Sequence, residues 1–278
     1  MVMDLAVELI HATVQVEQPL GDGTRTVGTG FLISAPGPDG APRTVLVTAN
    51  HVLQKMPGET ARIGYRISNP DGSWSYSPQS VKIRDGAGEA LWTQHPNRDV
   101  AAISIKAPPE FAKAALPVDY LASDDTFDRY RVGAGDEMMA LGFPRGLSAN
   151  AAGFPILRSG RVASYPVAPA QIFPTFLLDF SVFPGNSGGP VFVSREAKSE
   201  TGVTQVSDEK DPGFIAGLLT QQVELNSERL EIGIVTHAKY VRETIALMEN
   251  PLAPATIAQT APAIVGGRTA AAEEAARD

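Results

Sequence analysis

The segment Phe183–Val191, with the sequence FPGNSGGPV, holds one serine among glycines. Glycine adopts backbone φ angles that other residues resist, and it lets the main chain approach a bound group closely. Such a turn can expose the hydroxyl of Ser187 as a nucleophile and aim the N–H groups of Gly185 and Ser187 at a developing oxyanion. A serine hydroxyl is a weak nucleophile at neutral pH, so the chain must also supply a base.

A histidine and an aspartate stand beside two apolar segments. Residues 44–50 (TVLVTAN) lead directly into His51, and Asp99 precedes residues 100–105 (VAAISI). Both segments are typical of buried strands, because they are short, apolar and rich in β-branched residues. We expect His51 to accept the proton of the serine hydroxyl and Asp99 to hold the imidazole in the required tautomer.

Two other aspartates, Asp71 and Asp85, also lie between the histidine and the serine. Asp71 is part of a Pro-Asp-Gly sequence, and Asp85 begins a glycine-rich stretch. Both are loop settings, whereas Asp99 begins an apolar strand. Asp99 is therefore the predicted third member of the site.

The chain order His51, Asp99, Ser187 is that of the trypsin-like serine peptidases, and the chain resembles this family, in particular its bacterial HtrA/Deg type. The resemblance covers roughly residues 5–249. Further matching segments are residues 28–34 (GTGFLIS), 140–146 (ALGFPRG) and 159–162 (SGRV).

The resemblance implies a serine endopeptidase that forms an acyl-enzyme, with a peptide or protein as the substrate. No cofactor and no metal ion are expected, because no set of His, Asp and Glu residues has metal-ligand spacing. His237 could be taken for a second catalytic histidine, but it lies where the last strand meets the final helix. We expect it at a helix N-terminus or on the surface.

The resemblance also places a substrate-binding pocket in front of the serine loop. Its expected lining residues are Ser181, Val182, Phe183, Leu219 and Thr220. The position six residues before the serine is Ser181, so no carboxylate is available there for a basic side chain. The prediction is cleavage after small or aliphatic residues.

Asn186 precedes the serine at a position where trypsin has an aspartate. That aspartate pairs with a new N-terminal amine after proteolytic activation, and an asparagine carries no charge for such a pair. The resemblance therefore implies that cleavage of a precursor is not needed for activity.

Turn-forming residues are frequent, with 26 Gly and 22 Pro, which favours many short strands. Strand candidates fall into two sets of six, so the predicted fold class is all-β, with two six-stranded antiparallel β-barrels of the chymotrypsin-like kind and a C-terminal helix. The first set is 7–17, 26–34, 44–48, 61–68, 80–84 and 100–105, and the second is 137–141, 156–164, 175–180, 191–193, 214–220 and 231–235.

The expected organisation has three parts. Residues 1–118 form an N-terminal barrel, residues 119–249 form a C-terminal barrel with its terminal helix, and residues 250–278 form a flexible tail rich in Ala and Pro. The helix is predicted over 238–250, where apolar residues recur at helical spacing before Pro251. HtrA-type chains usually continue into a peptide-binding PDZ domain, and we expect none here.

Charge and composition exclude several classes of function. The net charge is −8, and no basic stripe is present, so a nucleic-acid partner is not expected. The first residues lack both a basic segment followed by an apolar run and a membrane span, so we expect a cytoplasmic protein that does not bind membranes. Cysteine is absent, so the core alone must stabilise the fold.

Two alternatives to a competent enzyme remain open at this stage. One is a catalytically silent trypsin-like module that binds peptides or proteins. The other is a module whose activity requires an activating partner or an oligomer. Labelling by a fluorophosphonate probe separates a competent enzyme from both.

Overall fold

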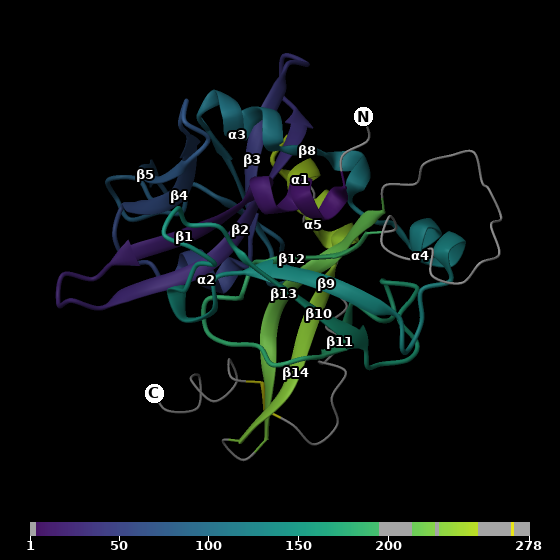
Figure 1. Cartoon of the computed structure of the whole chain (residues 1–278). Coiled ribbons are helices and arrows are strands. Elements are labelled where there is room, and N and C mark those ends of the chain that lie inside the picture. Colours follow the sequence, from purple (N-terminus) through teal and green to yellow (C-terminus); the bar gives the residue numbers. More distant parts are fainter. Residues whose placement is uncertain (1–3, 195–212, 226–227, 250–267, 270–278) are drawn as a thin grey trace.

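A computed structural model describes residues 4–194, 213–225, 228–249 and 268–269 of the chain. The described residues form two antiparallel sheets, one in each half of the sequence, with short helices between and around them (Figure 1). Each sheet combines strands that follow one another in the sequence, such as β1 and β2, with strands that are distant in sequence, such as β3 and β7.

The first sheet has the strand order β5-β4-β1-β2-β3-β7-β6. Its strands are β1 (Thr13–Pro19), β2 (Arg25–Pro36), β3 (Pro42–Thr48), β4 (Thr60–Ser68), β5 (Trp74–Lys82), β6 (Thr93–Gln94) and β7 (Ala101–Ile105), and β8 (Leu116–Pro117) adds a short parallel pairing to β2.

The second sheet has the strand order β12-β9-β10-β11-β14-β13-β15, and β12 also pairs with β13. Its strands are β9 (Glu137–Gly142), β10 (Ile156–Val162), β11 (Thr175–Asp179), β12 (Pro190–Val193), β13 (Phe214–Leu225), β14 (Glu228–His237) and β15 (Arg268–Thr269). The pairing of β12 with β13 closes six of these strands into a barrel.

The prediction of two closed barrels is wrong for the first half of the chain. Among the described residues, β5 and β6 end the first sheet and do not pair with each other. The strand β6 has only two residues, and β5 contains Pro78, which has no N–H to donate to a further strand. The mostly exposed side chains of β5 agree with an edge position.

The strand predicted over 7–17 is also only partly right, because its first half is the helix α1 (Leu5–Ala12). The side chain of Asp4 accepts a hydrogen bond from Ala6 N at 3.0 Å and so begins the helix. Leu5 and Leu9 are fully buried on one face. Burial of this helical face outweighs the β-branched residues that favoured a strand.

The remaining helices are short. They are α2 (Asn50–Gln54), α3 (Pro109–Ala114), α4 (Asp124–Tyr130) and α5 (Ala238–Leu247), with 3-10 turns η1 (Val118–Tyr120) and η2 (Pro144–Gly146). The predicted C-terminal helix is confirmed as α5. Of the tail expected over 250–278, all but the strand β15 lies outside the described residues.

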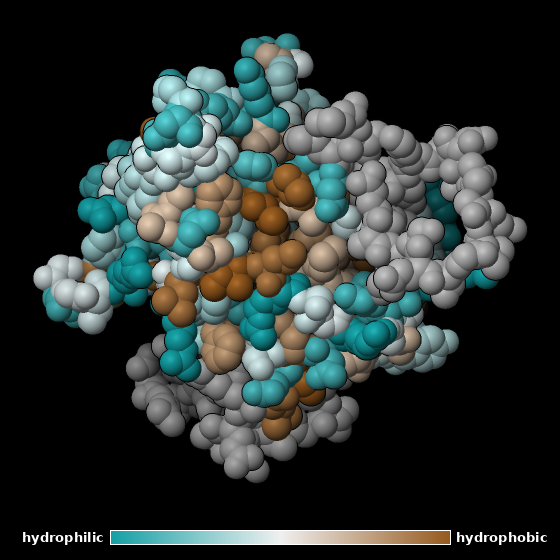
Figure 2. Space-filling view, viewed as in Figure 1, coloured by the Kyte–Doolittle hydropathy of each residue, from teal (hydrophilic) through white to brown (hydrophobic). Residues whose placement is uncertain are grey.

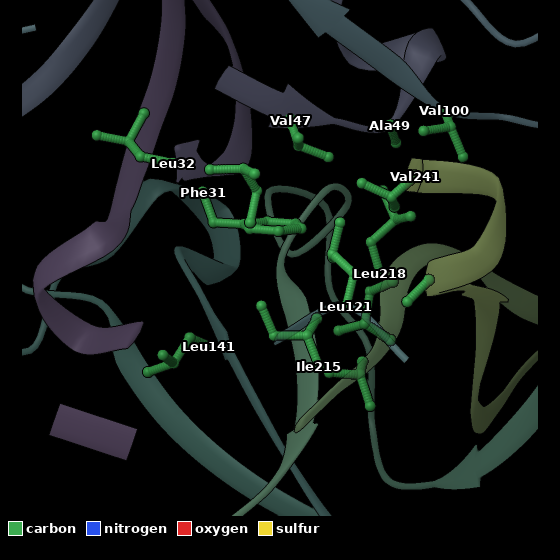
Figure 3. Close-up of a cluster of buried hydrophobic side chains, with 14 of the residues drawn as sticks. Phe31, Leu32, Val47, Ala49, Val100, Leu121, Leu141, Ile215, Leu218 and Val241 are labelled. Atoms are coloured by element: carbon green, nitrogen blue, oxygen red, sulfur yellow. The ribbon is translucent and has the colours of Figure 1, made fainter. Parts of the chain in front are cut away.

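One hydrophobic core joins the two halves. Figure 3 shows Phe31 of β2 and Val47 of β3 gathered in one cluster with Leu218 of β13 and Val241 of α5. These side chains are all fully buried. The core therefore fixes the end of β3 against the second sheet, which is where the predicted chemistry lies.

Apolar residues also gather on the outside of the molecule, in the middle of the face that Figure 2 shows, near α1 and the strands β9 and β12 of Figure 1. In the part of the chain that the structure describes, no helix has both the length and the apolar character needed to cross a membrane.

Candidate active site

His51 and Asp99 are brought together by the pairing of two strands. The strands β3 and β7 are antiparallel, and Thr48 at the end of β3 lies opposite Ala101 at the start of β7. His51 follows Thr48 in the first turn of α2, and Asp99 precedes Ala101, so both side chains extend from the same end of the sheet.

The Asp99 carboxylate holds His51 at two points. Its Oδ2 lies 2.6 Å from His51 Nδ1, and its Oδ1 accepts the backbone N–H of His51 at 2.8 Å. The side chains of His51 and Asp99 are 29% and 25% exposed, so solvent reaches the pair from one side. A carboxylate at this position keeps the proton on Nδ1 and leaves Nε2 free to accept a proton.

The neighbouring residue Asn50 fixes the start of α2. Its Oδ1 accepts a hydrogen bond from Trp92 Nε1 at 2.8 Å, and both residues are buried. The position of His51 is therefore set by its own contacts with Asp99 and by a buried contact one residue earlier.

The loop that carries Ser187 requires glycine at two positions. Gly185 and Gly188 have φ angles of +97° and +87°, which other residues rarely adopt. A Cβ at Gly185 would overlap the carbonyl oxygen of Phe143, and one at Gly188 would overlap the carbonyl oxygen of Thr29. The loop is therefore packed directly on the main chain of its neighbours.

Two N–H groups in this loop, those of Gly185 and Ser187, have no acceptor among the described residues. The carbonyls of the same peptide groups are held: Pro184 O accepts Arg145 N–H at 2.6 Å, and Asn186 O accepts Gly189 N–H at 3.0 Å. In a trans peptide the N–H points opposite to the C=O. The N–H groups of Gly185 and Ser187 therefore point away from Arg145 and Gly189, the residues that bind the two carbonyls.

The hydroxyl of Ser187 donates a hydrogen bond to the carbonyl oxygen of Thr220 at 3.3 Å. Neither this hydroxyl nor His51 Nε2 makes a hydrogen bond to the other in the described structure. The serine loop nevertheless adjoins the histidine segment, because a Cβ at Gly188 would lie 2.9 Å from Ala49 N, two residues before His51.

The residues predicted to line the pocket fall into two groups. Val182 and Leu219 are buried and lie beside Gly233, where a Cβ would come within 2.8 Å of Val182 Cγ2 and 3.3 Å of Leu219 Cδ2. Thr220 is also buried, and its Oγ1 lies 3.3 Å from both Ile234 O and Thr236 Oγ1. The Thr220 side chain thus contacts the neighbouring strand β14, while its carbonyl accepts the serine hydroxyl.

The other two predicted lining residues contact arginines that the sequence reasoning did not include. The carbonyl of Ser181 accepts a hydrogen bond from the Arg158 guanidinium. The ring of Phe183 lies 5.4 Å from the guanidinium carbon of Arg145 and 5.6 Å from that of Arg158. Arg145 belongs to the segment 140–146, which matches the family in its sequence.

A cavity of about 430 Å³ opens beside Asp99, between the two halves of the chain. The first half contributes Asn97, Arg98 and Asp99. The second half contributes mainly apolar residues, among them Tyr165, Pro166, Phe173, Pro174, Leu177 and Ile234. Thr220, which the sequence analysis placed in the substrate-binding pocket, also borders this cavity. The rest of the wall was not predicted, although the run 164–174 is rich in proline.

His237 stands at the N-terminus of α5, as predicted, but it is buried and not on the surface. Its ring lies 4.7 Å from the ring of Phe127 and 5.0 Å from that of Phe176. Burial lowers the pKa of His237 to about 4, so the residue is neutral near pH 7. Its position in an aromatic cluster separates it from the His51–Asp99 pair.

Within the described residues, no group of three or more His, Cys, Asp or Glu side chains is placed to hold a metal ion. The candidate site therefore consists of a histidine–aspartate pair, a nearby serine hydroxyl and two N–H groups without acceptors. Such a set can perform acyl transfer.

Comparisons with known proteins assign the sequence to a family and relate its fold to solved structures. Residues 28–198 match the family model described as a trypsin-like peptidase domain. No curated protein matches the sequence.

Solved structures of similar fold include the HtrA-type protease AlgW. Its structure with a tripeptide is 17% identical with a TM-score of 0.54, and covers 88% of this chain and 62% of the AlgW chain. Its structure with a decapeptide is 16% identical with a TM-score of 0.52, and covers 89% of this chain and 67% of the AlgW chain. The likeness at these identities is one of fold, and this chain spans less than two thirds of the tripeptide-bound AlgW chain.

Proposed function

Because residues 28–198 match its model, the chain belongs to the trypsin-like peptidase family, and we propose that it is a serine endopeptidase. Ser187 is the nucleophile, His51 the general base and Asp99 the group that orients His51. The observation that carries the proposal is the two-point contact of Asp99 with His51, beside a serine loop whose N–H groups at Gly185 and Ser187 find no acceptor in the described part of the chain.

The proposed reaction begins when the Ser187 hydroxyl leaves the Thr220 carbonyl and attacks a peptide carbonyl carbon. His51 accepts the hydroxyl proton at Nε2, and Asp99 stabilises the imidazolium through the Nδ1–H contact. The N–H groups of Gly185 and Ser187 bind the oxyanion. His51 then donates its proton to the leaving amine, and water hydrolyses the acyl-enzyme by the same steps in reverse.

The substrate in this proposal is a peptide or protein segment. The residue before the cut would contact Val182 and Leu219, which are apolar, and would meet no carboxylate at Ser181. Two arginines beside Phe183, Arg145 and Arg158, add positive charge near the pocket. Small or aliphatic residues are therefore favoured before the cut, and basic residues are disfavoured.

A fluorophosphonate probe tests the proposal, because it modifies only an activated serine. Wild-type protein should be labelled, whereas Ser187→Ala and His51→Ala should not be, with melting temperatures almost unchanged. Ser104→Ala is the matched control, because Ser104 is exposed on β7 away from the site, and this variant should be labelled like wild type. Persistent labelling or casein hydrolysis by Ser187→Ala would refute the assignment.

One observation favours a second candidate, a trypsin-like module that is silent or needs an activating partner. The Ser187 hydroxyl bonds Thr220 O and not His51, which is a resting arrangement. In that case, folded wild-type protein would resist the probe when alone. Labelling that appears only with an added partner or in an oligomer would identify the activated form.

A further inference from the structure

Thr29 lies at the centre of the contacts that hold the serine loop. It is fully buried in β2, within the Gly28-Thr29-Gly30 segment. Its backbone N–H donates to Ser187 O at 2.9 Å, and its carbonyl accepts the Thr48 hydroxyl at 2.6 Å. Because Thr48 lies three residues before His51, Thr29 connects the serine loop with the strand that leads to the histidine.

The Thr29 hydroxyl makes a second bridge, between two loops. It donates to Gly185 O at 2.6 Å and accepts the N–H of Phe143 at 3.1 Å. A hydroxyl can do both at once, because it carries one proton and two lone pairs. Gly185 and Phe143 are both buried, so neither group can turn to solvent if the hydroxyl is lost.

The bonds to Gly185 O and Pro184 O hold the two peptide groups next to Gly185, whose N–H is one of the two proposed oxyanion-hole donors. The hydroxyl fixes the carbonyl of Gly185, and Arg145 N–H fixes the carbonyl of Pro184. The peptide groups on both sides of the Gly185 Cα are thus held from outside the loop. The direction of the Gly185 N–H follows from these two bonds, since the glycine itself offers no steric restraint.

We propose that Thr29 is a positioning residue that aims the Gly185 N–H through its hydroxyl and holds Ser187 through its backbone. The inference rests on the proposed function, and it assigns to the threonine of the Gly-Thr-Gly segment a role that the sequence analysis did not give it. Thr29 does not touch the reacting atoms. It acts on catalysis only through the serine loop.

The test compares Thr29→Val with Thr29→Ser. Valine keeps the volume, but it puts a methyl group where Gly185 O and Phe143 N now approach a hydroxyl at 2.6 and 3.1 Å, so the loop must shift. Removal of an oxyanion donor, or misplacement of a group by about 1 Å, typically costs 10²-fold or more in rate. We expect Thr29→Val to lower kcat about 10- to 100-fold with KM nearly unchanged, and Thr29→Ser to retain most of the activity.

Thr13→Val is the matched control. Thr13 is also fully buried, and it begins β1, the strand paired with β2, but its Oγ1 has no hydrogen-bond partner in the described structure. This variant removes a buried threonine hydroxyl without touching the serine loop. Its kcat should equal that of wild type.

A second measurement is independent of activity. The backbone N–H of Phe143 uses the Thr29 hydroxyl as its acceptor, so its hydrogen exchange should be at least about 10-fold faster in Thr29→Val and unchanged in Thr29→Ser and Thr13→Val. If Thr29→Val does not fold, Thr29→Ala replaces it, because alanine removes the hydroxyl without adding bulk near the loop.

The outcomes separate the inference from the proposed function. Wild-type kcat in Thr29→Val, a loss that serine does not restore, a change confined to KM, or unaltered exchange at Phe143 would overturn the role of Thr29. If wild-type protein is inactive toward probe and substrate, the proposed function fails. Faster Phe143 exchange in Thr29→Val would then still support the hydrogen bonds by which the Thr29 hydroxyl holds the loop. Unaltered exchange would overturn that part of the inference as well.

Discussion

At the residue scale, Asp99 holds His51 through two different oxygens. The contact with the backbone N–H sets the position of the histidine, and the contact with Nδ1 sets its tautomer. These two effects can be separated by substitution. Asparagine keeps one oxygen for the backbone contact but replaces the other with an N–H₂ group.

Asp99→Asn should therefore preserve the fold and abolish most of the turnover. The amide nitrogen facing Nδ1 is a donor, so Nδ1 must become an acceptor and the proton moves to Nε2, which can then no longer act as a base. The equivalent change in another serine peptidase lowers kcat about 10⁴-fold, and we expect a loss of that order here. Steady-state hydrolysis of a peptide substrate measures it, and Asp85→Asn serves as the control.

Asp85 is a suitable control because its role is local. Its Oδ1 accepts the N–H groups of Ala87 and Glu89 within one turn, and the Asp71 Oδ1 likewise accepts hydrogen bonds from the nearby Ser73. Of the three aspartates, Asp99 is the one that precedes an apolar strand, and it is the one that contacts His51. If Asp85→Asn lost activity and Asp99→Asn did not, the choice of Asp99 would be wrong.

The surroundings of the predicted specificity pocket were harder to predict from the sequence than the contact between His51 and Asp99. The backbone of Ser181 and the ring of Phe183 contact Arg158, which lies on β10, a strand distant in sequence. No local pattern indicates such a contact, because it depends on how strands pair across the sheet. Thr29 was missed for the same reason, although its segment had been singled out.

Cleavage sites in a peptide library should show small or aliphatic residues before the cut. In the proposed pocket, Val182 and Leu219 would supply apolar contacts, and Arg145 and Arg158 lie beside Phe183. A lysine or arginine entering this environment would lose hydration without gaining a carboxylate. Mass spectrometry of the products identifies the preference, and dominant cleavage after Lys or Arg would contradict it.

At the scale of elements, the sequence predicted the central strands well and the edges poorly. The strands β2 and β3 were predicted because they are rich in Val, Ile and Thr, and β9 was predicted from a short apolar run that ends at Gly142. The helix α1 was missed, although Asp4 before Leu5 and Leu9 is a helix-start pattern. Closure of a barrel was beyond sequence reasoning, since it depends on which distant strands pair.

The junction of β14 and α5 holds His237, whose burial makes stability depend on pH. The folded-state pKa is lowered to about 4 from an ordinary value of 6.5, chiefly by burial, while the nearby Asp124 carboxylate raises it and the Lys239 ammonium lowers it. Between these values the unfolded chain binds a proton that the folded chain does not. His237 therefore reduces stability as the pH falls from about 6.5 toward 4.

His237→Phe should remove this part of the pH dependence. A phenyl ring can pack between Phe127 and Phe176 and does not titrate, although the variant loses the hydrogen bond of the imidazole with the Val167 backbone at every pH. We expect the unfolding free energy of wild type to fall by up to about 3 kcal/mol more than that of the variant between pH 7 and pH 4. Urea denaturation at several pH values measures the difference, and parallel curves would show that His237 is not responsible.

At the scale of the whole molecule, the two sheets share one core and lie on either side of the candidate site. The cluster in Figure 3 includes side chains of β2, β3, β13 and α5, so neither half can lose its packing without exposing the other. The serine loop belongs to the second half, and the His51–Asp99 pair belongs to the first. Their relative position therefore depends on this common core.

A substitution in the second half should accordingly destabilise the first half by the same amount. Leu218 of β13 is fully buried in the shared core, and Leu218→Ala should cost about 2–5 kcal/mol. Both tryptophans of the chain, Trp74 and Trp92, lie in the first half, so their fluorescence reports on that half alone. Circular dichroism reports on both sheets together.

In urea, the fluorescence and circular dichroism midpoints of Leu218→Ala should coincide and should be shifted equally from wild type, as expected for one cooperative unit. Leu157→Ala is the control, since Leu157 is 44% exposed on β10 and its loss should leave both midpoints almost unchanged. A fluorescence midpoint that stays at the wild-type value while the circular dichroism midpoint falls would show that the halves unfold separately. In that case the packing between them could not be what holds His51 against the serine loop, and contacts such as those of Thr29 would have to do so alone.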